Sequence, residues 1–299
     1  MTRPGSPQVR SFNSAGASPR ERLEQMQVRA ADAPLVMVTA YDALSARIAD
    51  DAGVDLILVG DSAATTMLGY QNTRDVELSE MLMLTRAARR GTRSALLVGD
   101  LPFGTYEDSD VQAVATAQAF MAVGCDFVKL EGAGVMCDRV RAIVDAGIPV
   151  VGHVGLLPQS AETPADLRTR GRSADEAMRI LHDARALESA GVSLLVVEAV
   201  PAPVGAAIAS HIHVPVIGIG AGRNVGGQVL VYTDLLGLGS GHLPRFVRTY
   251  ANARAVWAQA LLAYARDVRS GAFPAAVETY GMSDAEFAAF RDALGALRS

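Results

Sequence analysis

The stretch Phe127-Val128-Lys129-Leu130-Glu131-Gly132 indicates the fold, because it is an apolar run that carries charged residues only toward its end. Such a run is typical of a strand buried in a parallel sheet. Of the 27 Lys+Arg residues in the chain, Lys129 is the only lysine. An ammonium group is compact whereas a guanidinium is planar and forked, so we interpret Lys129 as serving a site where arginine would not fit. The alternative is a lysine that persists by chance.

Similar apolar runs recur on both sides of this stretch and alternate with helical patterns. The predicted strands cover residues 35–39, 56–59, 95–98, 127–130, 149–153, 194–197 and 214–219, with a weaker candidate at 229–231. The predicted helices cover residues 43–52, 78–90, 111–123, 135–146, 174–190 and 204–210, and residues 244–297 are mostly helical. This βα repeat predicts an α/β fold, a (β/α)8 TIM barrel with extra C-terminal helices. A doubly wound open sheet is the alternative.

The domain organisation is expected to be simple. We expect residues 21–299 to form a single barrel domain that includes the C-terminal helices. Residues 1–20 are rich in Pro, Ser, Gly and Arg, and we expect them to form a disordered tail. A transit peptide is the less favoured interpretation of residues 1–20, because this stretch has no amphipathic period.

Composition excludes several classes of partner. The chain is 50% hydrophobic but only 5% aromatic, which predicts an aliphatic core. A net charge of −5 and a pI near 5.6 argue against a nucleic-acid or anionic-membrane partner. No apolar run is long enough to span a membrane. Cys125 and Cys137 have no metal-like or redox spacing, so we expect reduced thiols in a cytoplasmic protein.

Polar residues stand at the end of one predicted strand after another. They are Asp61, Asp100, Glu131, His153 and Glu198, and Lys129 lies within its strand. Parallel strands present their carboxyl ends at one edge, where barrels and open sheets both carry their sites. One or two acids at such positions would be ordinary caps and turns. Four acids, a lysine and a histidine on one rim favour a functional site instead.

The residue types on this rim suit metal-assisted enolate chemistry. The carboxylates of Asp61, Asp100 and Glu131 are hard oxygen ligands, which Mg²⁺ prefers. A metal acts as a Lewis acid on a carbonyl oxygen, and the lysine adds positive charge beside a substrate carboxylate or enolate. Glu198 is the candidate base that removes the proton. The alternative for Glu198 is a structural ion pair with an arginine.

The sequence also resembles the ketopantoate hydroxymethyltransferase family, of the phosphoenolpyruvate mutase/isocitrate lyase superfamily, from about residue 35 to residue 274. The matching stretches are Val38-Thr39-Ala40-Tyr41-Asp42, Leu58-Val59-Gly60-Asp61-Ser62, Asp100-Leu101-Pro102-Phe103, Val128-Lys129-Leu130-Glu131-Gly132, Gly152-His153-Val154-Gly155-Leu156-Leu157-Pro158-Gln159-Ser160, Glu198-Ala199-Val200-Pro201 and Ile217-Gly218-Ile219-Gly220-Ala221-Gly222. Each stretch alone is weak, but together they are highly specific.

The resemblance implies a one-carbon transfer from 5,10-methylenetetrahydrofolate to 3-methyl-2-oxobutanoate, giving 2-dehydropantoate for pantothenate biosynthesis. It implies that Mg²⁺ is held by Asp61 and Asp100, with Glu131 joining directly or through water. It implies that Asp61, Ser62, Asp100 and Lys129 hold the oxo acid, that His153 lines the site, and that Glu198 accepts the proton. It also implies a large homo-oligomer, commonly a decamer.

Three departures from the family pattern lie around these motifs. Residues 165–172 lack the family's double glycine, aromatic and Val-Gln, Gly226 stands where an acid is usual, and Gln71 replaces another acid. The metal and base positions are intact, so the pattern fits a divergent member. Two alternatives remain: a related metal-dependent C–C lyase or aldolase acting on another 2-oxo acid without folate, and a non-catalytic paralogue.

Overall fold

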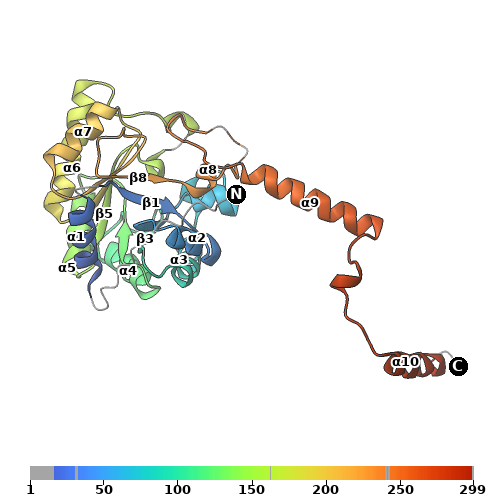
Figure 1. Ribbon diagram of the computed structural model, residues 1–299. Coiled ribbons are helices and arrows are strands. Elements are labelled where there is room, and N and C mark those ends of the chain that lie inside the picture. The colour runs from blue at the N-terminus through green and yellow to red at the C-terminus, as the bar shows by residue number, and fades with distance from the viewer. Residues whose placement is uncertain (1–16, 31–32, 162, 240, 242, 298–299) are drawn as a thin grey trace. The chain divides into compact units, whose positions relative to one another are not determined.

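Eight parallel strands close into a barrel in the computed structural model, which describes residues 17–30, 33–161, 163–239, 241 and 243–297 (Figure 1). The strands are β1 (Leu35–Thr39), β2 (Leu56–Val59), β3 (Leu96–Asp100), β4 (Phe127–Lys129), β5 (Val150–Gly155), β6 (Leu194–Glu198), β7 (Val216–Ile219) and β8 (Gly227–Leu230). Each strand pairs with the next in sequence, and β8 pairs with β1 to complete the ring. The predicted TIM barrel is therefore confirmed, and the open-sheet alternative is wrong.

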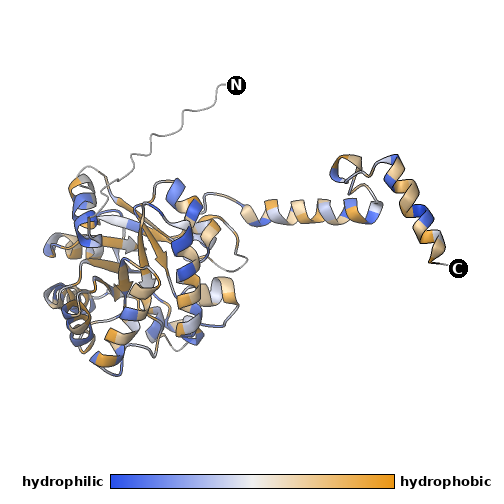
Figure 2. Cartoon of the chain, turned by 90° about the horizontal axis from the view of Figure 1, so that it is seen from below, coloured by the Kyte–Doolittle hydropathy of each residue, from blue (hydrophilic) through white to orange (hydrophobic). Residues whose placement is uncertain are grey.

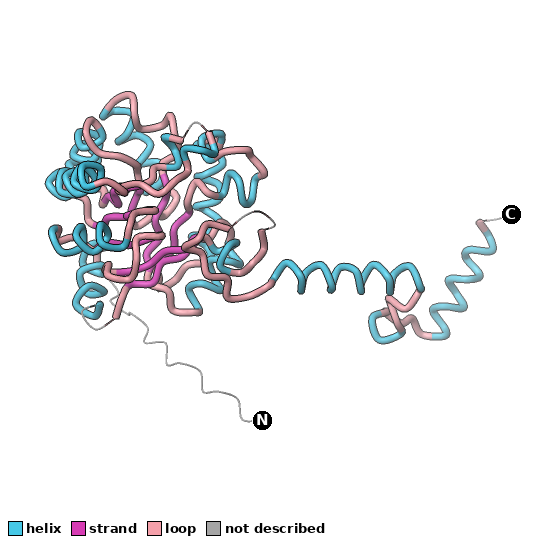
Figure 3. Tube along the Cα trace, turned by 90° about the horizontal axis from the view of Figure 1, so that it is seen from above, coloured by secondary structure: helices cyan, strands magenta, loops and turns pink. Residues whose placement is uncertain are grey.

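Helices surround the strands, as the tube view shows (Figure 3). They are α1 (Pro19–Ala30), α2 (Ala43–Asp51), α3 (Leu78–Gly91), α4 (Asp110–Ala122), α5 (Met136–Asp145), α6 (Ala174–Ala190), α7 (Ala202–His211) and α8 (Tyr232–Leu235). Short turns are η1 (Ala64–Leu68), η2 (Thr73–Asp75), η3 (Pro158–Ser160) and η4 (Pro164–Asp166). The βα loops that contain η1 to η4 follow β2 and β5, so they border the carboxyl end of the barrel.

The core has two apolar layers, because successive strand residues face opposite sides. One layer lies between the strands and the helices and includes Ile57, Leu97 and Val128. The other contains alternate strand residues such as Leu58 and Phe127. Phe127 shares a strand face with Lys129, which places the lysine on the interior side of β4.

Helix α1 is an element that the sequence interpretation missed. Leu23 is buried and belongs to the inner core layer together with Leu35, the first residue of β1. Arg22 donates to the carbonyl of Ser94 and lies near Asp126. The helix thus packs against the amino-terminal side of the strands. Of the tail predicted for residues 1–20, residues 1–16 lie outside the described residues, and α1 begins at Pro19.

Strand β8 is the least obvious strand in the sequence, since two glycines, Gly226 and Gly227, stand at its start. A Cβ at Gly227 would lie 2.4 Å from Cδ1 of Ile217 and 2.6 Å from the carbonyl oxygen of Leu35. Neighbouring strands approach so closely here that a side chain does not fit. The absence of a side chain weakens the strand pattern while it permits closure of the barrel.

Residues 251–299 form a second unit, separate from the unit formed by residues 1–250. It contains α9 (Ala253–Ser270), η5 (Ala276–Glu278) and α10 (Asp284–Ala296), in which apolar and polar residues alternate along the helices (Figure 2). Large apolar side chains such as Trp257, Leu261 and Phe290 are exposed. The expectation of one domain over residues 21–299 stays a prediction. Across the described residues, no helix has the length and apolar character to cross a membrane.

Candidate active site

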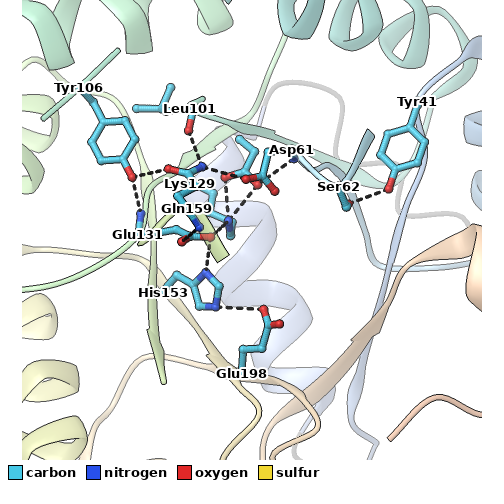
Figure 4. A network of polar contacts seen from close by, with 11 residues as sticks. Tyr41, Asp61, Ser62, Leu101, Tyr106, Lys129, Glu131, His153, Gln159 and Glu198 are labelled. Atoms are coloured by element: carbon cyan, nitrogen blue, oxygen red, sulfur yellow. Dashed lines mark hydrogen bonds and ion pairs between the residues drawn. The ribbon is translucent and has the colours of Figure 1, made fainter. Parts of the chain in front are cut away.

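One cavity at the carboxyl end of the barrel brings together every site residue that the sequence predicted (Figure 4). Its lining includes Asp61, Ser62, Asp100, Lys129, Glu131, His153 and Glu198. These side chains come from the ends of β2 to β6, and apolar residues such as Val196 and Ile219 complete the walls. The cavity has a volume of about 110 Å³, which suits a small acid.

Lys129 is the only cation of this group apart from His153, and it is almost fully buried. Its Nζ donates to Oδ1 of Asp100 at 2.7 Å and to Oδ2 at 2.9 Å, and lies 3.5 Å from Oε1 of Glu131. Burial opposes the charge of the ammonium, but Asp100 and Glu131 outweigh it and raise the pKa of Lys129. The lysine is therefore charged and held between two carboxylates of the protein, whereas its predicted contact with a substrate carboxylate stays a prediction.

The negative charge of Asp61 is less well balanced by nearby positive charge than that of Asp100. Burial, followed by repulsion from Asp100, raises the pKa of Asp61 well above its usual value. The backbone N–H of Asp61 donates to Oδ2 of Asp100 at 3.1 Å, so the two carboxylates lie side by side. Such a pair of buried acids favours a cation beside it.

The residues fit Mg²⁺ by this chemistry, because Mg²⁺ in proteins is usually held by one or two carboxylates and keeps several waters. Among the described residues no group of three or more His, Cys, Asp or Glu side chains is arranged as a ready metal site. The oxygens of Glu131 are already engaged by Lys129, His153 and the backbone N–H of Gln159. Glu131 as a metal ligand stays a prediction, and a water-mediated role agrees best with these contacts.

His153 lies between two acids. Its Nδ1 is 3.1 Å from Oε1 of Glu131, and its Nε2 is 3.3 Å from Oε2 of Glu198. Burial acts to lower the pKa of His153, but the charge of Glu131 outweighs it and raises the pKa to about 9. The imidazolium therefore lies between Glu131 and Glu198, and its contact with Glu198 is an ion pair without hydrogen-bond geometry. No arginine pairs with Glu198 in the described part of the chain, and its side chain is 16% exposed, more than those of its neighbours.

Ser62 occupies the opposite wall. Its hydroxyl lies 2.8 Å from the hydroxyl of Tyr41, a fully buried residue. Burial raises the pKa of Tyr41 to about 12, so this phenol stays neutral and can share a hydrogen bond with Ser62. The serine is thereby held at the cavity wall, where a ligand oxygen can reach it.

Gln159 and Tyr106 are buried against the acids, although neither was predicted as a site residue. Gln159 stands in a stretch that the family resemblance singled out, yet its contacts join segments far apart in the sequence. The sequence offers no local pattern for such a contact.

A second, outer cavity of about 360 Å³ adjoins the first and shares Thr73 and Pro158 with it. Its other lining residues are Thr65, Gln71, Asn72, Ala161, Thr163 and Leu167. The lining combines hydroxyl and amide groups with apolar surface, and all of it comes from the loops after β2 and β5. The two cavities thus border each other at Thr73 and Pro158.

Comparison with known proteins points to one family. The family model described as ketopantoate hydroxymethyltransferase matches residues 20–276. A 3-methyl-2-oxobutanoate hydroxymethyltransferase of Nitratidesulfovibrio vulgaris is 50% identical over 261 residues, which is 87% of this chain and 85% of that protein. Its counterpart from Aeropyrum pernix is 48% identical over 81% of this chain and 88% of its own length.

Solved structures show the same fold at low sequence identity. A 2,3-dimethylmalate lyase of the PEP mutase/isocitrate lyase superfamily superposes with a TM-score of 0.60 at 18% identity, covering 84% of this chain and 88% of that one. A phosphonopyruvate hydrolase in complex with oxalate and Mg²⁺ gives 0.59 at 14% identity, covering 94% and 98%. These solved structures therefore share the barrel fold of this chain.

Proposed function

The chain belongs to the ketopantoate hydroxymethyltransferase family, and from this premise we propose that it converts 3-methyl-2-oxobutanoate into 2-dehydropantoate, a step of pantothenate biosynthesis. The one-carbon donor in this proposal is 5,10-methylenetetrahydrofolate, and water supplies the hydroxyl oxygen, so that tetrahydrofolate leaves. This proposal rests on the inner cavity, whose lining contains the charged Lys129, the two aspartates and Glu198. That arrangement suits a 2-oxo acid that must lose a proton beside its carbonyl group.

Glu198 is the proposed base. It lines the cavity, is the most exposed of the four acids, and its charge is held near His153 by the 3.3 Å contact. It would take the proton from C3 of the oxo acid. Water would cleave the two C–N bonds of the donor's methylene group to give formaldehyde and tetrahydrofolate, and the electron pair left on C3 would bond to the formaldehyde carbon, whose oxygen takes up a proton and becomes the hydroxyl. His153, itself braced by Glu131, keeps Glu198 in place for this step.

The opposite wall of the cavity would bind and orient the oxo acid. Lys129 and the hydroxyl of Ser62 would contact its carboxylate or carbonyl oxygens, since both line the cavity with donors. Asp61 and Asp100 would hold Mg²⁺, which when bound supplies Lewis-acid polarisation of the carbonyl group. Apolar walls such as Val196 and Ile219 would receive the methyl groups and exclude water.

The outer cavity would receive the folate carrier. It borders the inner cavity at Thr73 and Pro158. Its amides and hydroxyls match the donor and acceptor edge of a pterin, and Leu167 offers an apolar contact for a ring. Gln71 and the 165–172 segment, which depart from the family pattern, contribute to this wall. The proposed folate-binding wall is therefore where this chain departs from the family pattern.

Assembly and compartment belong to the same proposal. The exposed apolar side chains of residues 251–297, among them Trp257 and Phe290, suit burial in a homo-oligomer, for which the family resemblance suggests a decamer. Cys125 and Cys137 are free, as expected of a cytoplasmic protein.

The test is product formation by the purified protein. With Mg²⁺, methylenetetrahydrofolate and 3-methyl-2-oxobutanoate, we expect 2-dehydropantoate by mass spectrometry, and we expect EDTA to abolish it until Mg²⁺ is restored. Folded, Mg²⁺-loaded protein that forms no product contradicts the proposal. Turnover with free formaldehyde or another aldehyde but never with the folate would favour the related aldolase, which the altered 165–172 segment motivates.

A further inference from the structure

Gln159 contacts both sides of the acidic cluster. It lies in η3 and is 1% exposed. Its side-chain Nε2 donates to Oδ2 of Asp61 at 3.1 Å, and its backbone N–H donates to Oε2 of Glu131 at 3.0 Å. One residue from the loop after β5 thus holds carboxylates that belong to two other loops.

The orientation of this amide is fixed by Tyr106. The backbone N–H of Glu131 donates to the Tyr106 hydroxyl at 3.3 Å, which leaves the phenolic hydrogen to be donated to Oε1 of Gln159 at 2.7 Å. The Nε2 group must then face Asp61, and it also donates to the carbonyl oxygen of Leu101 at 3.0 Å. The reversed amide would place its oxygen against a carboxylate and a carbonyl, and would leave the tyrosine without an acceptor.

This chain of contacts determines which oxygen of Asp61 is free. Oδ2 accepts from Gln159, whereas no hydrogen bond to Oδ1 is found within the described residues. Asp61 lines the inner cavity beside Asp100. A carboxylate held by one oxygen presents the other in a defined direction, which is what a cation with strict octahedral geometry requires.

We propose that Gln159, oriented by Tyr106, is a positioning residue that turns Asp61 so that its Oδ1 is presented to a divalent cation (Figure 4). This inference rests on the cation site of the proposed function. The tyrosine acts only through the amide: it fixes the direction of the hydrogen bonds and has no contact of its own with Asp61. Partners of this kind change metal affinity by about 10- to 100-fold when they are removed.

The experiment measures Mg²⁺ binding to the full-length protein by titration calorimetry without either substrate. Tyr106→Phe removes the hydroxyl but keeps the ring, and Gln159→Leu removes the amide at similar volume. We expect each to raise the Kd for Mg²⁺ by about 10- to 100-fold. The matched control is Tyr70→Phe, which also loses a tyrosine hydroxyl bond, here to Glu80 on α3. We expect its Mg²⁺ Kd to stay within about twofold of the wild type, because neither Tyr70 nor Glu80 lines the inner cavity.

Melting temperatures in EDTA separate positioning from folding. If Tyr106→Phe and Gln159→Leu melt lower in EDTA yet bind Mg²⁺ as the wild type does, their role is structural and the inference is overturned. If Gln159→Leu does not fold, the folded Tyr106→Phe protein decides alone. A wild type that forms product but titrates no Mg²⁺ also overturns the inference while the proposed function stands. The expected Kd shift in a protein that forms no 2-dehydropantoate supports the inference and refutes the proposed function.

Discussion

The inner and outer cavities adjoin, yet they are built in different ways. The inner cavity is made by residues at the ends of strands, and Asp61, Asp100, Lys129 and Glu131 are all nearly fully buried and hydrogen-bonded. The outer cavity is made by the loops after β2 and β5, and Gln71 and Leu167 in it are exposed. The departures from the family pattern at Gln71 and in residues 165–172 lie in these loops.

The difference has a physical cause. A buried charge whose partner is removed costs several kcal/mol, about 3–5 for a broken buried ion pair, so a change at one inner position requires changes at the others. An exposed loop residue exchanges protein contacts for water at little cost. The inner cavity therefore keeps its chemistry, while the outer cavity can change the ligand that it accepts. The predictions below probe this contrast.

Glu198→Gln should have the largest effect on catalysis. The amide keeps the shape of the side chain but cannot accept the C3 proton, so kcat should fall by about 1,000-fold, within the range for loss of a general base. KM for the oxo acid should change little. The measurement is steady-state formation of 2-dehydropantoate, with deuterium exchange at C3 as an independent readout of proton removal.

Glu24→Gln, at an exposed ion pair of α1, is the matched control for the Glu198 variant and should retain wild-type rates. Unchanged turnover of Glu198→Gln would mean that the proposed base is idle and that another group takes the C3 proton, whereas a folded wild type that forms no product would revive the non-catalytic paralogue.

Lys129→Arg should reduce kcat/KM by about 100-fold, the cost of moving a reacting group by about 1 Å. The larger guanidinium cannot keep the 2.7 Å and 2.9 Å contacts of Nζ with Asp100 without displacing it. The measurement is kcat/KM for the oxo acid. The control is Arg86→Lys on α3, which should leave kcat/KM unchanged. Near-native kcat/KM in Lys129→Arg would show that the lone lysine has no special role.

These inner positions are also where the sequence was most informative. Lys129 stood out as the single lysine, and Asp61, Asp100, Glu131, His153 and Glu198 stood out because each follows an apolar run. A parallel barrel gathers the ends of its strands by construction, so local patterns sufficed to predict the fold and the members of the site. The pattern also placed β1 and β2 at their observed bounds.

What the sequence could not reveal depends on contacts between distant segments. The bond of Gln159 with Tyr106 spans 53 positions, and that of Gln159 with Asp61 spans 98. No periodicity encodes such pairs. Helix α1 was missed for a related reason, since Leu23 is the one buried residue among its described side chains, and Arg22 contacts Ser94 and Asp126 far along the chain. The outer cavity belongs to the same class, because it is formed by two loops.

His153→Gln should have an intermediate effect, about a tenfold loss of kcat, roughly the 1.4 kcal/mol of one modest polar contact. The amide cannot reach Glu131 and Glu198 at once, as the ring does at 3.1 Å and 3.3 Å. Glu198 would lose its fixed position while its carboxylate remains. The double variant with Glu198→Gln should be no slower than Glu198→Gln alone. Additive losses would show that the histidine acts independently of Glu198.

Gln71→Ala should have the smallest effect, confined to the outer cavity. Loss of one exposed hydrogen-bonding side chain amounts to about 1 kcal/mol, so KM for methylenetetrahydrofolate should rise by about fivefold. KM for 3-methyl-2-oxobutanoate and the Kd for Mg²⁺ should stay unchanged, because Gln71 lines only the outer cavity. Gln25→Ala on α1, an exposed residue, is the control and should alter none of these values. If Gln71→Ala instead impaired the oxo acid and the folate equally, the two cavities would work as one site, and the freedom of the outer loops to diverge would need another explanation.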